Sequence, residues 1–209
     1  MIKKIVNTVL AGFYIGLGAT AYFMIDNKVL GSLFFCAGIL LVMNFYNMLF
    51  TRVCPLSFIK EYSVGDAVLT FIGNTVGGFI CALLIKFTRI FPIIEEKFTA
   101  TVQTKLSDSL LSIVVLGILC GIMVAYAVFA AKKYQSQKGI AIFFYILFVA
   151  LFVICGFEHV VANAFYYSLY ILKTGAASIS LIILPFLASL LGNIIGGGAV
   201  ALLEKYRNA

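Results

Sequence analysis

The sequence predicts an all-α polytopic membrane protein, and three observations carry that prediction. Hydrophobic residues make up 63% of the 209 positions, charged residues only 11%, and the mean hydropathy is +1.12. Soluble domains average about half apolar and about a quarter charged residues. Apolar runs recur along the whole chain, which has room for about six spans of ~20 residues. A separate soluble domain is not expected.

Each apolar run is predicted to form one span of a single transmembrane channel domain, residues 1–209. The expected spans are Ile5–Ile25, Leu30–Phe50, Val64–Ile85, Leu106–Ala130, Gly139–Tyr170 and Ile179–Leu203. The first run follows Lys3 and Lys4 but has no small-residue cleavage site, so we interpret it as a span and not as a signal peptide.

Two of the six spans carry interruptions. The second is expected to break at residues 51–55, which read TRVCP, and a short amphipathic piece is expected at Leu56–Tyr62. The fifth is too long for one straight helix and is expected to break near Gly156. Between spans 3 and 4, residues 86–105 are expected to form the longest polar connection.

A repeated motif divides the chain into two halves. Residues 73–78 read GNTVGG in span 3, and residues 192–197 read GNIIGG in span 6. With three spans each, the halves at about 5–85 and 106–203 must have opposite orientations in the membrane. Inverted repeats with paired broken helices are typical of transporters and channels. Asn74 and Asn193 are expected to hydrogen-bond between repeats or to the interrupted helices.

The charges predict the orientation and exclude some functions. With both termini in the cytoplasm, nine Lys and Arg residues lie inside and six outside, as the positive-inside rule requires. We therefore expect a multi-pass protein of the cell's inner (plasma) membrane. The net charge is +7, but no basic patch is large enough for nucleic acid.

The lone histidine of the chain, His159, lies beside Glu158 in the middle of span 5. An ionisable pair at that depth costs a few kcal/mol and marks a functional site by default. Gly156 just before it favours a broken helix, which requires a packed or water-lined setting. We expect His159 either to line a pore or to bond a backbone carbonyl in the core. The five cysteines lack metal-ligand spacing, so no metal site, cofactor or enzyme activity is predicted.

Several segments form a recognisable set: AGFYIGLGA (11–19), LFT (49–51), LGILCG (116–121), GFEHVVANAFY (156–166) and LGNIIGGGAV (191–200). Together they resemble the formate/nitrite transporter family. The resemblance implies an aquaporin-like fold, a homopentamer with one pore per protomer, and small monovalent anions such as formate, nitrite, hydrosulfide, acetate or lactate as substrates. It also implies an Ω-shaped loop in span 2.

The resemblance also implies roles for individual residues. His159 matches the central pore histidine, Thr51 the loop threonine that faces it, Asn163 an asparagine one turn on, and Lys105 a lysine near the periplasmic vestibule. Two hydrophobic constrictions are implied: Ile39 and Phe50 match the cytoplasmic one, and Phe152 matches the periplasmic one.

The sequence departs from the family pattern at Gly121, where an asparagine is usual, and at Arg52, where small or polar residues are common. Gly121 is expected to leave room near the pore. Arg52 is expected either to reach the membrane interface or to attract or block anions.

Residue spacing within span 5 predicts how its polar side chains are arranged. His159 and Asn163 are four apart, so we expect them on one helix face. Glu158 is expected to point about 100° away, with a structural role in accepting backbone N–H groups at the break.

These observations lead to one functional hypothesis with two rivals. We expect a channel or transporter for small weak-acid anions that is coupled to protons through His159 and lies in membrane lipid. The rivals are a membrane scaffold without transport and an aquaporin-like channel for neutral solutes.

Overall fold

A computed structural model describes residues 1–207, and every regular element in that range is a helix. In chain order the helices are α1 (Ile2–Met24), α2 (Lys28–Asn44), α3 (Phe50–Phe58), α4 (Val64–Lys86), α5 (Ile90–Ser107), α6 (Leu110–Lys133), α7 (Lys138–Cys155), α8 (Val160–Thr174), the 3₁₀ turn η1 (Ala176–Ser178) and α9 (Ile179–Arg207). The predicted all-α class is confirmed.

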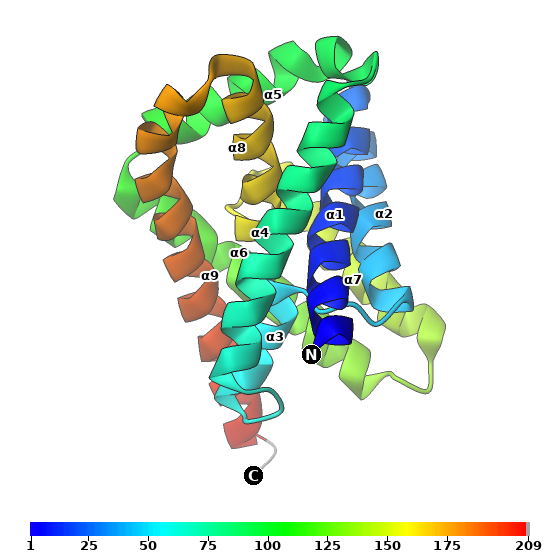
Figure 1. The fold of residues 1–209 in the computed structure, drawn as a ribbon. Helices are drawn as coiled ribbons and strands as arrows, with labels where there is room; N and C mark the ends of the chain where they lie inside the picture. Colours follow the sequence, from blue (N-terminus) through cyan, green and yellow to red (C-terminus); the bar gives the residue numbers. More distant parts are fainter. Residues whose placement is uncertain (208–209) are drawn as a thin grey trace.

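The long helices run side by side, and α5 lies across one end of the molecule (Figure 1). Helix α1 begins and α9 ends at the opposite end, so both termini lie on one side (Figure 1). The stretches long and apolar enough to cross a membrane within 1–207 are α1, α4, α6, α7 and Ala176–Arg207. Helix α2 is apolar but shorter, with 17 residues.

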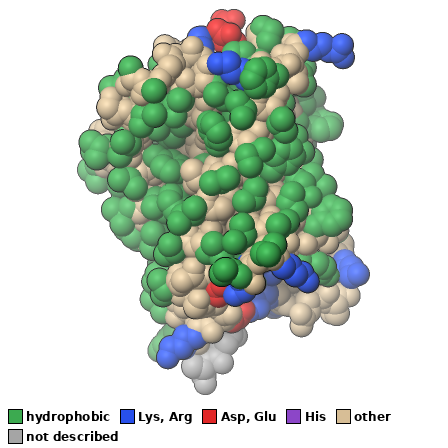
Figure 2. Space-filling view, in the orientation of Figure 1, with side chains coloured by type: hydrophobic (Ala, Val, Ile, Leu, Met, Phe, Trp, Pro, Cys, Tyr) green, Lys and Arg blue, Asp and Glu red, His purple; other side chains and the backbone are tan. Residues whose placement is uncertain are grey.

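The surface has the character of a membrane protein. In the face drawn in Figure 2, hydrophobic side chains cover the middle of the molecule, and Lys, Arg, Asp and Glu gather at its two ends. Since lipid tails satisfy no backbone hydrogen bonds, a fold made only of helices suits this environment.

The contacts between helices repeat across the two halves of the chain. Helix α1 packs along α2 and α4, and α6 packs in the same way along α7 and α9. The short helix of each half crosses to the other: α3 packs against α9, and α8 against α4. Helices α2 and α7 meet between the halves. The short helices are thereby brought to the centre of the molecule.

The predicted break at residues 51–55 is wrong, because the chain leaves the helix earlier. Helix α2 ends at Asn44, and Tyr46 has a positive φ of 54° in the link that follows. Helix α3 begins at Phe50, whose N–H is bound by the Asn74 side chain at 2.8 Å. The expected amphipathic piece Leu56–Tyr62 is therefore wrong too, since α3 ends at Phe58.

Pro55 lies inside α3 and does not end it. Proline in a helix removes the N–H that would have bonded four residues back, and its ring crowds the carbonyl of that residue. Its ring seats directly on Gly197 of α9, where a Cβ would stand 2.8 Å from the ring. Packing between the two halves thus holds a helix that sequence rules would stop.

The expected connection at residues 86–105 is mostly helix α5, which joins α4 to α6 and is not purely polar. Ile94, Phe98 and Val102, spaced four residues apart, are completely buried. This spacing forms one apolar helix face, while the charged residues occupy the other. Pro92 falls in the first turn, where a helix needs no N–H from it.

Candidate functional site

His159 is the N-cap of α8 and lies almost completely buried, with 3% of its surface exposed. Helix α7 ends at Cys155 and is capped by Gly156, which adopts a left-handed conformation with φ 72° that suits glycine. The chain then turns back, and α8 starts at Val160. A cap residue is not yet helical, so its side chain is free to reach across the start of the helix.

The hydrogen bonds of His159 define which ring nitrogen carries the proton in the neutral form. Nδ1 accepts a bond from the Ala162 N–H at 3.1 Å, so it has no hydrogen of its own. The proton therefore lies on Nε2, which is 3.1 Å from the Thr51 Oγ1. With Nε2 donating to that oxygen, the Thr51 hydroxyl keeps its own hydrogen to offer elsewhere. Two donors are thus linked in series in an apolar setting.

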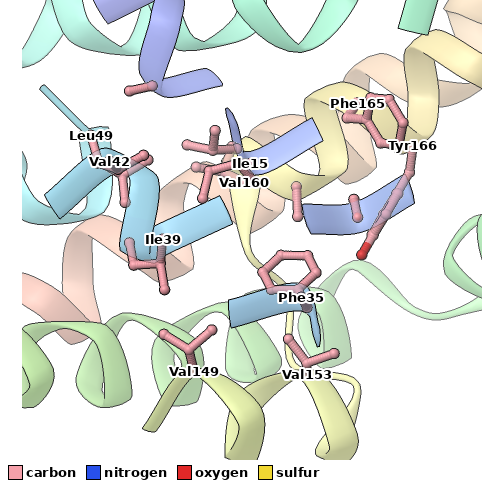
Figure 3. Packing of buried hydrophobic residues seen from close by; sticks show 14 of the residues in the cluster. Ile15, Phe35, Ile39, Val42, Leu49, Val149, Val153, Val160, Phe165 and Tyr166 are labelled. Carbon is pink, nitrogen blue, oxygen red and sulfur yellow. The ribbon is translucent and has the colours of Figure 1, made fainter. Parts of the chain in front are cut away.

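Aromatic and aliphatic side chains enclose this pair. The Phe152 ring stacks on the His159 ring with centroids 5.2 Å apart and planes 17° apart. Ile39 and Phe152 line a small cavity of about 10 Å³ together with His159. In Figure 3, Ile39 of α2 points toward Val149 of α7, and Phe35 lies one turn away on α2. The passage on this side of the histidine is narrow and apolar.

Phe50, the first residue of α3, packs against α4. Its ring packs on Phe71 of α4 at 5.5 Å and lines an apolar pocket between α3, α4 and α9. It is absent from the residues that line the cavities beside His159. The residues Phe35, Val124, Tyr145 and Val149 line that narrow passage instead.

Glu158 forms a buried ion pair with Lys105. The Lys105 Nζ is 2.6 Å from Oε1, and the two side chains are 10% and 4% exposed. The second oxygen, Oε2, accepts a bond from the Asn163 side-chain nitrogen at 2.6 Å. The expectation that Glu158 accepts backbone N–H groups is therefore wrong: both carboxylate oxygens are bound by side chains.

Asn163 and His159 do not share a helix face in the expected way, because His159 precedes the helix with ψ 110°. Both nevertheless line a cavity of about 60 Å³ on the far side of Phe152. The Asn163 Oδ1 is buried there and has no hydrogen-bond partner among residues 1–207. Lys105 also lines this cavity, with its charge already compensated by Glu158.

Two asparagines hold the interrupted helices in matching ways. Asn193 Oδ1 accepts from the Val160 N–H at 3.0 Å, and its Nδ2 donates to the Glu158 and Gly117 carbonyls at 2.7 and 2.9 Å. Asn74 makes the same three kinds of bond, from the Phe50 N–H and to the Met48 and Thr8 carbonyls. Each amide thus joins the start of a short helix to a long one, as expected.

Gly121 does not leave room near the site, so that expectation is wrong. A Cβ added there would stand 2.7 Å from the Asn193 backbone oxygen. Gly121 is a point of close approach between α6 and α9, and it sets the position of Asn193 through packing.

Sequence reasoning missed Tyr166 as part of this site. Its ring lies under the Lys105 ammonium at 5.8 Å, and it lines the 60 Å³ cavity. The signal was present in the motif, since residue 166 follows 163 by three positions and shares its helix face.

The cysteines form no site with other side chains. In the part of the chain that the structure describes, no three His, Cys, Asp or Glu residues are grouped to hold a metal ion. Cys155 is exposed, and the other four cysteines are buried, all as free thiols.

Comparisons with known proteins agree with this geometry. The family model for "Formate/nitrite transporter" matches residues 1–206. The formate channel FocA of Haemophilus influenzae is 30% identical over 154 residues, which cover 66% of this chain and 52% of that protein. The chain therefore spans about half the length of this relative.

Solved structures show the same fold. A pentameric formate channel with formate bound has a TM-score of 0.81 and 25% identity, over 98% of this chain and 96% of that one. The aquaglyceroporin of Plasmodium falciparum has a TM-score of 0.64 at 15% identity, over 96% and 94%, which shows a shared aquaporin-like fold alone. From the match along nearly its whole length, the chain belongs to the formate/nitrite transporter family.

Proposed function

We propose that this protein is a channel for small monovalent weak-acid anions of the formate, nitrite and hydrosulfide class, coupled to protons at His159. Family membership makes it a multi-pass membrane transport protein and not an enzyme. The observation that carries the proposal is the buried donor pair, His159 Nε2–H and the Thr51 hydroxyl, at an apolar narrowing between two cavities.

The proposed assembly is a homopentamer in the plasma membrane, with one pore per protomer and cytoplasmic termini. Residues 1–209 form one channel domain of six spans, in which α2–α3 and α7–α8 are the interrupted ones. The matching contacts of the two halves support inverted repeats at about 5–85 and 106–203. The pentameric formate channel of similar fold supports the oligomer.

Hydration decides what can pass such a narrowing. A bare anion that enters an apolar passage loses its water, and the cost amounts to several kcal/mol unless donors replace it. His159, Thr51 and Asn163 offer hydrogen bonds at one point only. Beyond them, Ile39, Phe152 and the other aliphatic and aromatic side chains that line the small cavity offer none, apart from the hydroxyl of Tyr145. We expect a weak acid to cross this part in its neutral form.

We assign the source of the proton that neutralises the anion to the water that fills the cavity. Neutral His159 uses Nδ1 as a helix cap and donates its Nε2–H to Thr51, so the Thr51 hydroxyl holds the anion while His159 keeps its proton. A proton from bulk water then joins the anion held there, and the neutral acid moves on. Lys105 keeps Glu158 compensated beside the cavity, which removes a fixed negative charge from the anion's route.

The experiment is uptake by purified protein in liposomes, with formate, nitrite, hydrosulfide, lactate, chloride and glycerol offered over a range of pH. We expect one or more weak-acid anions to pass much faster than chloride, and faster as the pH falls. Equal passage of chloride contradicts proton coupling. Rapid glycerol flux supports the neutral-solute channel, and refusal of every solute supports the scaffold.

Two variants locate the function at the donor pair. His159→Phe keeps a ring against Phe152 but removes both nitrogens, and Thr51→Val keeps the shape but removes the hydroxyl. Each is expected to reduce formate flux by about tenfold or more, since a lost hydrogen bond to a charged group costs about 1.5–3 kcal/mol. The control is Thr20→Val, because Thr20 is a buried threonine of α1 that bonds only the Gly16 carbonyl.

A further inference from the structure

A basic hollow lies at the end of the molecule that carries the termini, where α3, α6 and α9 end. Its volume is about 780 Å³, against about 30 Å³ for one water molecule, so it admits a ligand group of several heavy atoms. Among residues 1–207, the cations that line it are Lys132 and Lys133 in the last turn of α6 and Lys205 and Arg207 in the last turn of α9. Two spans of the chain thus bring four positive charges to one concave surface.

Two carboxylates offset part of this charge. Glu61, in the link between α3 and α4, lines the hollow and pairs with Lys132. Glu204 lines it too and pairs with Arg207 at 3.1 Å. Within the described chain the hollow therefore keeps an excess of two positive charges.

The two remaining cations, Lys133 and Lys205, have no carboxylate partner among residues 1–207. The Lys133 Nζ lies 5.6 Å from the centre of the Tyr134 ring, which is a neutral contact. The carbonyl ends of α6 and α9 carry roughly −0.5 each, which offsets about one of the two charges. About one positive charge is left uncompensated, and it matches a ligand with a single negative charge.

The hollow lies at the level where a bilayer places its headgroups. Helix α6 and the stretch that contains α9 are long and apolar enough to cross a membrane, and the cations lie in their last turns. Partly buried Ile59 and Phe129 line the hollow as well. Phe129 precedes Lys132 by three positions, so it shares that face of α6 and lies nearer the middle of the span. On α9, the exposed side chains of Leu202 and Leu203 also lie on the side of the span. A ligand seated here meets cations at one end and hydrocarbon at the other.

We propose that the basic hollow binds the phosphate of an anionic glycerophospholipid, of the phosphatidylglycerol class, from the leaflet on the side of the termini. Lys133 and Lys205 attract the phosphate, and the acyl chains follow Phe129 and the leucines of α9. Basic pockets between transmembrane helices are suited to anionic headgroups in this way. A zwitterionic lipid is disfavoured, because its own cation meets the same lysines. The site requires the membrane location of the protein and not its transport of anions, so it goes beyond the proposed function.

The test uses full-length protein in micelles that contain phosphatidylcholine and are titrated with phosphatidylglycerol. Native mass spectrometry counts the bound lipid, and melting curves report folding and stabilisation. Lys133→Gln/Lys205→Gln removes the two unpaired charges, and Glu61→Gln removes a carboxylate that offsets a cation. The control is Lys3→Gln/Lys138→Gln, because both are exposed lysines at the same end, outside the lining of the hollow and without an ion pair among residues 1–207. Inorganic phosphate and glycerol phosphate are added to separate samples without phosphatidylglycerol.

Wild-type protein is expected to retain phosphatidylglycerol in preference to phosphatidylcholine and to melt at a higher temperature with it. Lys133→Gln/Lys205→Gln should raise the half-saturating fraction of phosphatidylglycerol by roughly twenty- to thirtyfold, since each lysine near an anionic lipid contributes about fivefold. Glu61→Gln should lower that fraction by about fivefold, a gain that misfolding cannot produce. The control variant should leave it unchanged.

Four results overturn the lipid site. One is equal retention of the two lipids by wild-type protein, and another is an equal loss in the control variant, which would indicate a diffuse attraction of the whole end. A rise in melting temperature as large with either soluble phosphate would assign the hollow to a free phosphate. A fall in the number of subunits in Lys133→Gln/Lys205→Gln with unchanged lipid retention would assign it to a contact between copies.

Formate flux measured on the same proteins in liposomes separates the two proposals. If wild-type protein carries formate but shows no preference between the lipids, only the lipid site fails. If it selects phosphatidylglycerol but carries no anion, only the proposed function fails.

Discussion

Truncation of Asn193 to alanine tests whether one amide holds the break that carries His159. The side chain is 3% exposed and makes three hydrogen bonds, to the Val160 N–H and the Glu158 and Gly117 carbonyls. Hydrogen bonds in membrane proteins average about 0.6 kcal/mol each, which gives about 2 kcal/mol for three. Buried groups left without partners raise the cost further. We expect the free energy of unfolding to fall by about 2–4 kcal/mol.

The assay is equilibrium unfolding in mixed detergent micelles, followed by helical circular dichroism, with formate flux measured on the folded protein. Asn44→Ala is the matched control, because that exposed asparagine makes a single bond to the Leu40 carbonyl at 2.8 Å. It should change the stability by less than about 0.5 kcal/mol. If Asn193→Ala is as stable as the control and conducts formate normally, the bonds do not hold the break, and the reasoning is refuted.

Three further changes test neighbouring features. Lys105→Met should destabilise the protein by about 3–5 kcal/mol, because it leaves the buried Glu158 carboxylate without its cation. Adding Glu158→Gln should recover much of this loss in the same unfolding assay. If the effects of the two substitutions are purely additive, the two side chains are not coupled. Gly121→Ala should lower the melting temperature, because the new methyl meets the backbone of α9; an unchanged melting curve would show that the helices can separate freely. Lys97 donates a hydrogen bond to exposed Asp26 and thereby lowers the pKa of that carboxyl. The small contribution of this pair to stability is therefore present above the ordinary carboxyl pKa and is lost as the pH falls through the lowered value. Asp26→Asn should remove this loss of melting temperature at acid pH, and an identical dependence of melting temperature on acid pH in the two proteins would contradict the prediction.

Sequence patterns predicted what local periodicity and polarity determine. An amide in an apolar helix must find partners, so the repeated motif placed Asn74 and Asn193 correctly at the interrupted helices. The isolated ionisable pair, Glu158 and His159, marked the site for the same reason. Composition together with recurring apolar runs of span length was sufficient for the all-α class.

Features that depend on distant contacts were not predictable in this way. Helix α3 starts where Asn74, 24 residues away, binds the Phe50 N–H. The ring of Pro55 is accommodated by a glycine of the other half. Helix α5 was hidden by its charged face, although its apolar residues have helical spacing. The partner of Glu158 was also unpredictable, because Lys105 lies 53 residues away in sequence.

The two halves share a scaffold but not a chemistry. His159 is the N-cap of α8, and the residue in the same place before α3 is Leu49, which is completely buried and has no polar side-chain atom. The asparagine bonds around the two positions are nevertheless the same. Thr51, two residues after Leu49, supplies the polar group that reaches His159. The matching contacts of the two halves bring the two short helices together. Hydrogen-bond donors come only from His159 and Thr51 at the point where they meet, and mostly apolar side chains line the cavity beside them. On the proposed function, this asymmetry is what a weak acid needs: it binds donors as an anion and leaves them as a neutral molecule. A second histidine at position 49 would instead hold the anion on both sides and slow its release.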